Sequence, residues 1–377
     1  MMAVVVVVSS DWNRAPMTTY PRIAALATAA PPWRHTRESL LAFVRERVLG
    51  VQWSEREEAR EEARQIERRF LASKVESRQV CVDLESFYAQ PRSTGERMRA
   101  YARAAYDLGH DALASCLGVT PHAPPSRLTD LTVASCTGYT APGLDIQLSR
   151  DMGIPADARR VVIGHMGCFG GIVGLRQLAA SARAYPNVVA ALLSVELSSL
   201  HFATDLDRDA YALMALFGDG AAAALITCAE WATGPQIVDQ YCVADFSAAG
   251  QMTWEVGDTG FIMGLSPRVP VTLRRNVQAA LDRLLTPHGL DITDIKHWLV
   301  HPGGPSILEA IAARLKLADE QLAHSWKILR ERGNCSSATV LMVLEEAMRS
   351  GATRAGDWGV MMAFGPGLTL ETLLIRF

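Results

Sequence analysis

The segment that decides the fold of this chain is residues 161–174, with the sequence VVIGHMGCFGGIVG. Its apolar start, residues 161–163, predicts a buried strand, and the glycines on both sides of Cys168 predict a sharp turn. Apolar positions at Ile172 and Leu175 then predict a helix that begins with small residues. We therefore expect Cys168 to stand between the end of a strand and the N-terminus of a helix.

This position gives Cys168 two alternative roles. A helix N-terminus carries partial positive charge and unsatisfied N–H groups, and both favour a thiolate over a thiol. Cys168 is then a candidate nucleophile. The alternative is that it is a buried small hydrophobic residue, as most free cysteines are. The local pattern leaves both interpretations open.

The overall composition is that of an ordinary soluble globular protein, with 377 residues of which 49% are hydrophobic and 20% are charged. This length exceeds the usual size of a single hydrophobic core, so we expect two fused halves, residues 17–235 and 236–377. Residues 1–16 are expected to form an extension outside the core. Their apolar run is too short for a signal peptide or for a membrane span.

Charge and cysteine content exclude several classes of protein. The net charge of −3 and the pI of about 6.3 give no case for binding nucleic acid or an anionic membrane. The seven cysteines are scattered and form no CxxC pair, so neither a disulfide framework nor a zinc site is expected. Such cysteine usage is typical of the reducing cytoplasm, where we expect this protein to be located.

Strands and helices are predicted to alternate along most of the chain, which indicates an α/β protein with buried strands. Each half ends in a pair of strands, which indicates an internal duplication. A basic run around Lys74, Arg78 and Arg92 indicates a surface loop, with phosphate contact as the less favoured alternative. The predicted strands are 23–28, 128–134, 161–163, 188–197, 221–227, 297–300, 359–364 and 368–375, and the main predicted helices are 37–49, 54–70, 95–117, 144–152, 271–285, 306–315 and 338–348.

Three residues with catalytic potential stand in predicted strand-to-helix turns, namely Cys168, His301 and Asn334. A cysteine nucleophile needs a base or a cationic partner, and an imidazole within hydrogen-bond reach can serve. A side-chain amide at a helix start can donate a hydrogen bond to a developing oxyanion. The alternatives are that His301 is a capping or core histidine and that Asn334 is only a helix N-cap. Spacing alone does not show that the three residues meet.

The sequence resembles the type III polyketide synthases, the chalcone and stilbene synthase family, in a bacterial form. Five motifs carry this resemblance, in the family's order, and it extends over roughly residues 20–377. They are GCFGG at 167–171, ALFGDGA at 215–221, HPGGP at 301–305, GNCSSA at 333–338 and FGPGLT at 364–369.

The resemblance implies a thiolase fold, an α/β fold of five layers (α-β-α-β-α) with two similar halves, and a homodimer. It implies that Cys168 takes a starter acyl group from acyl-CoA and that His301 and Asn334 stabilise the oxyanions formed during decarboxylative condensation with malonyl-CoA. The expected product is an aromatic or pyrone polyketide. We expect no metal, nicotinamide or flavin cofactor, because the chemistry needs none and the sequence has no binding motif for one.

The resemblance also indicates residues that bind substrate. Phe217 corresponds to a gatekeeper between the CoA tunnel and the cavity. A second gatekeeper falls on Gly260 in a gap-free match, or on Phe261 if one residue is inserted. Cys136 is interpreted first as cavity wall, ahead of a second reactive thiol or plain packing. The remaining expected substrate-binding residues are Thr137, Ser198, His201, Ser336, Gly365 and Pro366; His201 either orients a polyketide carbonyl or is hydrogen-bonded within a wall.

Three other functions compete with this one. A stand-alone ketosynthase would condense two preformed acyl chains bound to CoA or to an acyl carrier protein, so a carrier protein remains an alternative partner. A non-catalytic partner of thiolase fold is disfavoured because Cys168, His301 and Asn334 are all present. A redox-sensing role is weaker still, because no two cysteines are spaced as a resolving pair.

Overall fold

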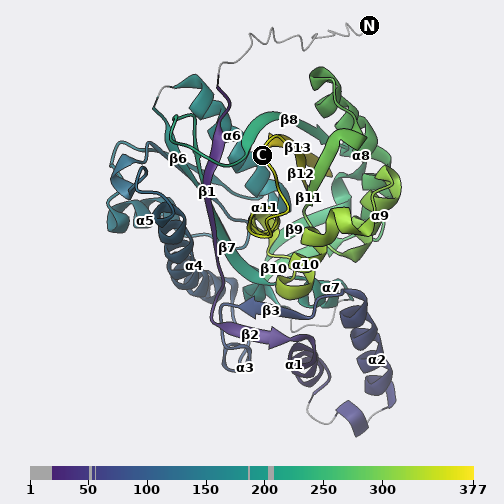
Figure 1. Cartoon of the computed structure of the whole chain (residues 1–377). Helices are drawn as coiled ribbons and strands as arrows, with labels where there is room; N and C mark the ends of the chain where they lie inside the picture. Colours follow the sequence, from purple (N-terminus) through teal and green to yellow (C-terminus); the bar gives the residue numbers. More distant parts are fainter. Residues whose placement is uncertain (1–18, 51–52, 56, 186, 203–207) are drawn as a thin grey trace, which may run out of the picture.

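The computed structural model describes residues 19–50, 53–55, 57–185, 187–202 and 208–377, and the predicted extension at 1–16 lies outside them. Within these residues the strands form one sheet of nine strands and two short two-stranded sheets (Figure 1). The nine-stranded sheet consists of two half-sheets, one from each half of the chain.

The first half-sheet has the strand order β5-β4-β6-β7-β1. β4 is parallel to β5 and β6, whereas β7 is antiparallel to β6 and to β1. The chain passes from this half to the next between β7 and β8, where the boundary at residue 235 was predicted. The strands are β1 (Arg22–Ala29), β4 (Asp130–Ala134), β5 (Arg159–Ile163), β6 (Val189–Leu197) and β7 (Asp219–Thr227).

The second half-sheet repeats this arrangement in the order β11-β12-β13-β8. β11 and β12 are parallel, and β13 is antiparallel to β12 and β8, just as β7 is antiparallel to β6 and β1. The half-sheets meet at one residue pair, Arg22 with Gln236. The strands are β8 (Gln236–Ala244), β11 (Ile295–Val300), β12 (Trp358–Gly365) and β13 (Thr369–Arg376).

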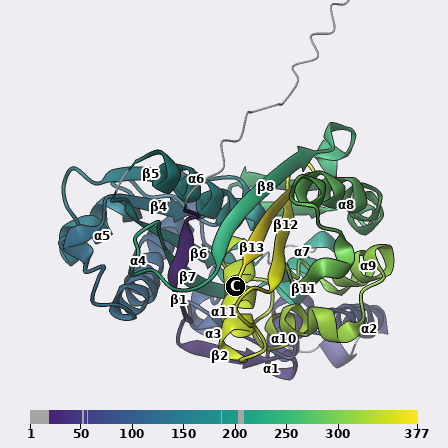
Figure 2. The ribbon, with the colours of Figure 1, turned by 45° about the horizontal axis from the view of Figure 1, so that its top comes forward.

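Helices lie between the half-sheets and on their outer faces (Figure 2). The two central helices are α6 (Gly170–Ala184) and α11 (Thr339–Arg349). The outer helices are α4 (Thr94–Gly118) and α5 (Leu144–Met152) on the first half, and α8 (Val269–Leu285) and α9 (Pro305–Leu315) on the second. The expected five-layered fold with two similar halves is therefore confirmed.

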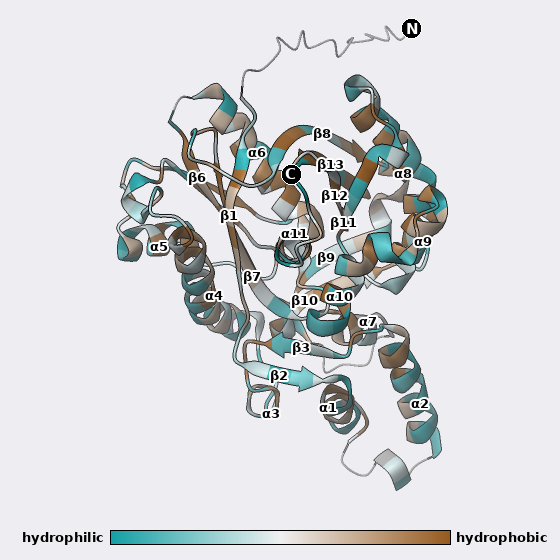
Figure 3. Cartoon of the chain, in the orientation of Figure 1, coloured by the Kyte–Doolittle hydropathy of each residue, from teal (hydrophilic) through white to brown (hydrophobic). Residues whose placement is uncertain are grey.

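Strand periodicity explains how one strand serves two cores. In β6, Ala191, Leu193 and Val195 pack in the core under α4, whereas Ala190 and Leu192 pack against α6 and α11. Successive side chains of a strand point to opposite faces, so a strand covered on both faces must be apolar throughout. Figure 3 shows this as hydrophobic residues along central strands such as β6, with hydrophilic residues on the outer sides of α2 and α4.

A smaller region beside the half-sheets supplies part of the site. β2 (Trp33–Thr36) pairs with β3 (Ser77–Val80), and β9 (Met252–Gly257) forms a hairpin with β10 (Gly260–Leu265). None of the helices in the described part of the chain is long and apolar enough to cross a membrane. The helices of this region are α1 (Arg37–Leu49), α2 (Glu57–Ala72), α3 (Leu84–Phe87), α7 (Arg208–Leu216) and α10 (Ala323–Arg332).

Two local predictions are wrong. Arg78 does not lie in a surface loop but on β3, fully buried, where it donates hydrogen bonds to the carbonyls of Met214, Ala215 and Phe217. It thereby satisfies carbonyl groups left free at the C-terminus of α7. The strand at 161–163 is also not fully buried, because β5 is the edge strand of its half-sheet and Val162 is 59% exposed.

Close packing between α6 and the segment after Asn334 leads to a testable prediction. A Cβ at Gly171 would lie 2.4 Å from the carbonyl oxygen of Ser337, so Gly171→Ala must push the two segments apart. We expect overpacking of this kind to destabilise the fold by about 1–3 kcal/mol and to lower the melting temperature in a calorimetric scan. Gly118→Ala, which meets nothing within 4 Å, is the matched control. Equal melting temperatures for the two variants would contradict the prediction.

Candidate active site

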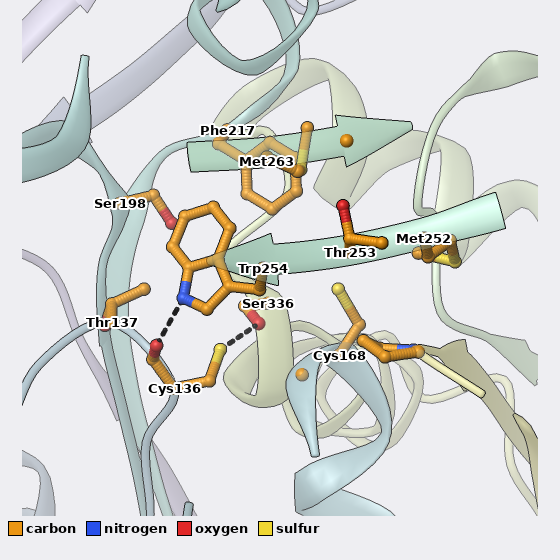
Figure 4. A pocket seen from close by; sticks show the side chains of 13 residues that line it. Cys136, Thr137, Cys168, Ser198, Phe217, Met252, Thr253, Trp254, Met263 and Ser336 are labelled. Atoms are coloured by element: carbon orange, nitrogen blue, oxygen red, sulfur yellow. Dashed lines mark hydrogen bonds between the residues drawn. The ribbon is translucent and has the colours of Figure 1, made fainter. Parts of the chain in front are cut away.

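A cavity lies where the turns of the two halves meet, and Cys168 lines it (Figure 4). Its volume is about 50 Å³. Of the residues predicted from the sequence, Cys136, Thr137, Cys168, Ser198, Phe217, Ser336 and Pro366 line it, and the other lining residues are Gly167, Met252, Thr253, Trp254, Met263 and Gly264.

Cys168 has the predicted position between a strand and a helix. It lies in a short 3-10 helix, Gly167–Phe169, that follows β5 and leads directly into α6. Gly167 has a φ of +69°, and a Cβ there would lie 2.8 Å from the Pro366 ring, so only glycine fits this turn. Burial raises the pKa of Cys168 to about 11, and it outweighs the lowering effect of hydrogen bonds with Ser336 and Asn334. The resting group is therefore a thiol, and its attack on a substrate needs a base.

The Asn334 side chain is oriented toward Cys168 by its own hydrogen bonds. Its Oδ1 accepts from the backbone N–H of Ser336 at 2.8 Å, although the N-cap of the short helix that follows is Cys335 and not Asn334. Both ends of the amide lie at similar distances from the Cys168 sulfur, Nδ2 at 3.9 Å and Oδ1 at 4.0 Å. The amide oxygen is therefore occupied within the turn, and the two N–H groups of Nδ2 remain available as donors near Cys168.

His301 is a buried imidazole without a hydrogen-bond partner on either ring nitrogen among the described residues. It follows β11, and its backbone N–H donates to Met362 of β12. The end of β12 in turn packs on the Cys168 turn, because Gly365 contacts Phe169 and Pro366 contacts Gly167. Burial lowers the pKa of His301 to about 3, so the ring is neutral near pH 7. A buried polar group without a partner is unusual and is typical of a site that awaits a ligand.

Glu196 is a functional candidate that sequence reasoning missed. This buried carboxylate, at the end of β6, accepts hydrogen bonds from the Cys136 backbone N–H, the Thr137 hydroxyl and the Ser337 hydroxyl. Burial raises its pKa above the usual value. It joins the loop after β4 to the loop after Asn334 and so holds two cavity walls together. The only sequence signal was a polar residue within an apolar strand.

Cys136 is part of this cavity wall. Its thiol lies 3.3 Å from the Ser336 hydroxyl and 3.5 Å from the Glu196 carboxylate. Burial, together with the negative charge of Glu196, raises the pKa of Cys136 well above that of a free thiol. A thiol in these surroundings stays protonated. The geometry therefore favours Cys136 as part of the cavity wall and disfavours it as a second reactive thiolate.

Three predicted residues lie behind the cavity lining. His201 is buried, with its ring stacked on Phe261 at a centroid distance of 4.3 Å. Both of its ring nitrogens are hydrogen-bonded to backbone groups, of Thr137 and of Phe261, which matches the interpretation as wall. Phe261 is covered by this contact, and Gly365 packs on Phe169. The aromatic residue that lines this side of the cavity is instead Trp254.

A second, larger cavity of about 440 Å³ is lined by Leu216, the residue before Phe217. Leu216 and Leu265 line this second cavity, whereas their chain neighbours Phe217 and Gly264 line the first one. The loop from Gly303 to the start of α9 lines it as well. The basic residue that lines the second cavity is Arg69. The Arg69 guanidinium forms no ion pair with any residue that the structure describes. Lys74, by contrast, pairs with Glu309 at the surface.

Comparison with known proteins agrees with this geometry. Family models for the N-terminal and C-terminal domains of chalcone and stilbene synthases match residues 69–230 and 240–377. The chain is 32% identical to a 1,3,6,8-tetrahydroxynaphthalene synthase from Streptomyces peucetius subsp. caesius, over 94% of this chain and 93% of the relative. It is 29% identical to a 3,5-dihydroxyphenylacetyl-CoA synthase from Streptomyces toyocaensis, over 98% and 94%.

Solved structures give the same result. The chain superposes on PKS-I from the brown alga Ectocarpus siliculosus with a TM-score of 0.88 and 27% identity, over 96% of this chain and 100% of that one. It superposes on the tetrahydroxynaphthalene synthase of Streptomyces coelicolor A3(2), a bacterial type III polyketide synthase, with a TM-score of 0.85 and 25% identity, over 95% and 99%. The chain therefore belongs to the chalcone and stilbene synthase family of type III polyketide synthases.

Proposed function

We propose that this enzyme loads a starter acyl group from CoA on Cys168, extends it with malonyl-CoA and cyclises the product to an aromatic or pyrone ring. The observation that supports the residue assignment is the side-chain amide of Asn334, which lies beside the Cys168 sulfur while its oxygen accepts from the Ser336 N–H. The products named for the relatives, among them an α-pyrone and a tetrahydroxynaphthalene, are of this chemical class.

Loading begins with attack of the Cys168 sulfur on the thioester carbonyl of acyl-CoA. His301 takes the thiol proton, which a neutral imidazole can do. The C–S bond to CoA then breaks, and the CoA thiolate takes the proton back from His301. The result is an acyl thioester on Cys168 and free CoA. Burial favours a neutral thiol and a neutral imidazole before substrate arrives, which suits this proton transfer.

Extension begins with loss of CO2 from malonyl-CoA. The C–C bond to the carboxylate breaks, and its electron pair forms an enolate whose oxygen carries the negative charge. Asn334 Nδ2–H and a ring N–H of His301 donate hydrogen bonds to that oxygen. The enolate carbon attacks the Cys168 thioester, and the Cys168 thiolate leaves. No electrons are exchanged with an external acceptor, so we assign no metal or redox cofactor to this reaction.

The second cavity is the proposed site of CoA. Arg69 and the N-terminus of α9 supply positive charge suited to phosphate groups. Phe217 lies between the two cavities and is the proposed gatekeeper past which the pantetheine arm delivers its acyl group. A ketosynthase that condenses two preformed chains, with an acyl carrier protein as partner, is the less favoured alternative, because the family's named relatives are polyketide synthases.

We assign a homodimer formed through β5. This strand is the free edge of the first half-sheet, and Val161, Val162 and Met166 on or beside it are exposed. Unpaired strand edges with apolar side chains favour pairing with another chain. We place the protein in the cytoplasm, because all seven cysteines are free thiols, as a reducing compartment favours.

Replacement of the nucleophile tests the loading step. Cys168→Ala removes the sulfur that forms the thioester, so incubation with acyl-CoA should add no acyl mass to the intact protein. Cys242→Ala, which removes an exposed thiol, is the control and should label like the wild type. Acyl mass retained on Cys168→Ala would assign the nucleophile to another residue.

Replacement of Asn334 tests the extension step. Asn334→Asp keeps the size of the side chain but lacks an N–H donor, so release of CO2 from malonyl-CoA should fall by about 10²–10³-fold. Asn276→Asp, at a distant surface site where Asn276 contacts Asp245, is the control. The assignment fails if Asn334→Asp, still folded by circular dichroism, releases CO2 at the wild-type rate.

The dimer is tested by placing a charge on the free edge. Val162→Lys should shift the mass measured by light scattering from that of two chains to that of one, because the lysine charge would have to be buried between the paired strands. Val271→Lys alters an even more exposed valine on α8 and should leave the mass unchanged. A wild-type protein that already elutes as a monomer contradicts the assignment.

A further inference from the structure

The C-terminus of α7 leads directly into the catalytic cavity. α7 ends at Leu216, and the next residue, Phe217, lines the cavity. The last carbonyl groups of a helix have no partner within the helix. Met214, Ala215 and Phe217 are buried, so their carbonyl groups need donors from elsewhere in the protein.

Arg78 on β3 supplies most of these donors. Its Nη1 donates to the carbonyl oxygens of Met214 at 2.7 Å and of Phe217 at 2.9 Å. Its Nη2 donates to the carbonyl oxygen of Ala215 at 2.8 Å. A guanidinium is planar and presents its N–H groups in a fixed geometry, so it can hold several carbonyl groups at once. One side chain therefore holds the backbone on both sides of Leu216.

The carbonyl group of Leu216 itself is held by Asn334. The Asn334 backbone N–H donates to it at 2.8 Å, and the Gly218 N–H donates to the Asn334 carbonyl oxygen at 3.0 Å. Arg78 and the Asn334 backbone together occupy the carbonyl groups of the four consecutive residues 214–217. The two residues are thus attached to the same short segment.

The packing around this segment leaves little room for a shift. A Cβ at Gly218 would lie 3.1 Å from the Cβ of Arg78. A Cβ at Gly333, the residue before Asn334, would lie 2.7 Å from the Leu216 carbonyl oxygen. Because the backbones are in close contact, a displacement of the segment must be passed on to Asn334.

The charge of Arg78 suits the end of a helix. All the groups that accept its hydrogen bonds in the described part of the chain are carbonyl oxygens. Carbonyl groups at a helix C-terminus carry partial negative charge and favour a cation. Burial lowers the pKa of Arg78 to about 9, so the group is still charged near pH 7. Its removal would leave three buried carbonyl groups without a donor, which favours a shift of the segment.

We infer that Arg78 is a positioning residue for the extension step. By holding residues 214–217 it fixes the backbone to which Asn334 is bonded, and with it the place of the Asn334 amide beside the Cys168 sulfur. Arg78 itself touches no substrate. This inference rests on the proposed function, because Arg78 acts through the donor that the extension step uses.

Arg78→Lys tests the inference with the charge retained. A single ammonium group cannot reproduce the planar contacts of a guanidinium with three carbonyl groups. We expect kcat for release of CO2 from malonyl-CoA to fall by about 10²-fold, the effect of misplacing a catalytic contact by about 1 Å. The rate is expressed per Cys168 that gains acyl mass from acyl-CoA, so that unfolded protein is not counted. KM should stay unchanged, because the weakened contact is made in the transition state.

A double variant shows whether Arg78 acts through Asn334. In the Asn334→Asp background, Arg78→Lys should lower kcat by less than about twofold more, because residues that act as a unit have non-additive effects. A general loss of stability would instead multiply the effects of the two substitutions.

Two further variants make the result specific. Arg183 on α6 also donates to two backbone carbonyl oxygens, of Ile237 and Val238, away from the cavity. Arg183→Lys is therefore the matched control and should keep the wild-type kcat. Arg78→Gln serves if the lysine variant does not fold, because its amide retains two N–H groups, and kcat should fall in the same direction.

The outcomes separate this inference from the function on which it rests. An unchanged kcat in a folded Arg78 variant overturns the inference, and so do effects of Arg78→Lys and Asn334→Asp that multiply. Failure of both Arg78 variants to fold would make Arg78 a residue of stability alone and overturns it as well. If Asn334→Asp alone releases CO2 at the wild-type rate, the proposed role of Asn334 fails, and the inference falls with it.

Discussion

The site depends on one short backbone bridge between the two halves of the chain. The Asn334 backbone N–H donates to Leu216, and the Gly218 N–H donates to Asn334, so that Phe217 and Asn334 pair like residues of neighbouring parallel strands. Gly218 permits this approach, since a Cβ there would lie 2.5 Å from the Arg332 carbonyl oxygen. This bridge links Asn334 of the second half, whose amide lies beside the thiol of the first half, to Phe217.

Burial determines the charge states around this bridge. The pKa of Cys168 is raised and that of His301 is lowered, and each shift has desolvation as its largest cause. Two neutral groups cost less to bury than two charged ones, so burial alone accounts for both shifts. Glu196 is also buried, but three groups donate hydrogen bonds to it, so it serves to hold walls together. Surroundings of low polarity strengthen hydrogen bonds to charged groups, which suits the proposed reaction.

Local patterns predicted most strands and helices, because the apolar runs and glycine turns of this chain follow regular periods. They failed where a distant partner decides the outcome. Arg78 appeared to be a surface cation, yet the carbonyl groups of α7, far along the chain, accept its hydrogen bonds in the interior. The apolar run at β5 resembled a buried strand, but among the described residues no further strand pairs with its outer edge. Phe261 was expected in the cavity, and the register of the hairpin placed Trp254 there instead.

The sequence by itself determined the alternation of elements, the turn around Cys168 and, through five motifs, the family and its reaction. Those features depend on residues near one another in the chain, or on motifs that can be recognised without coordinates. Only the tertiary structure decided that the Asn334 amide lies beside the thiol, that Glu196 joins two walls, and that the β9–β10 hairpin lines the cavity. These depend on contacts between residues more than 50 positions apart, and on hydrogen-bond directions, which no local pattern encodes.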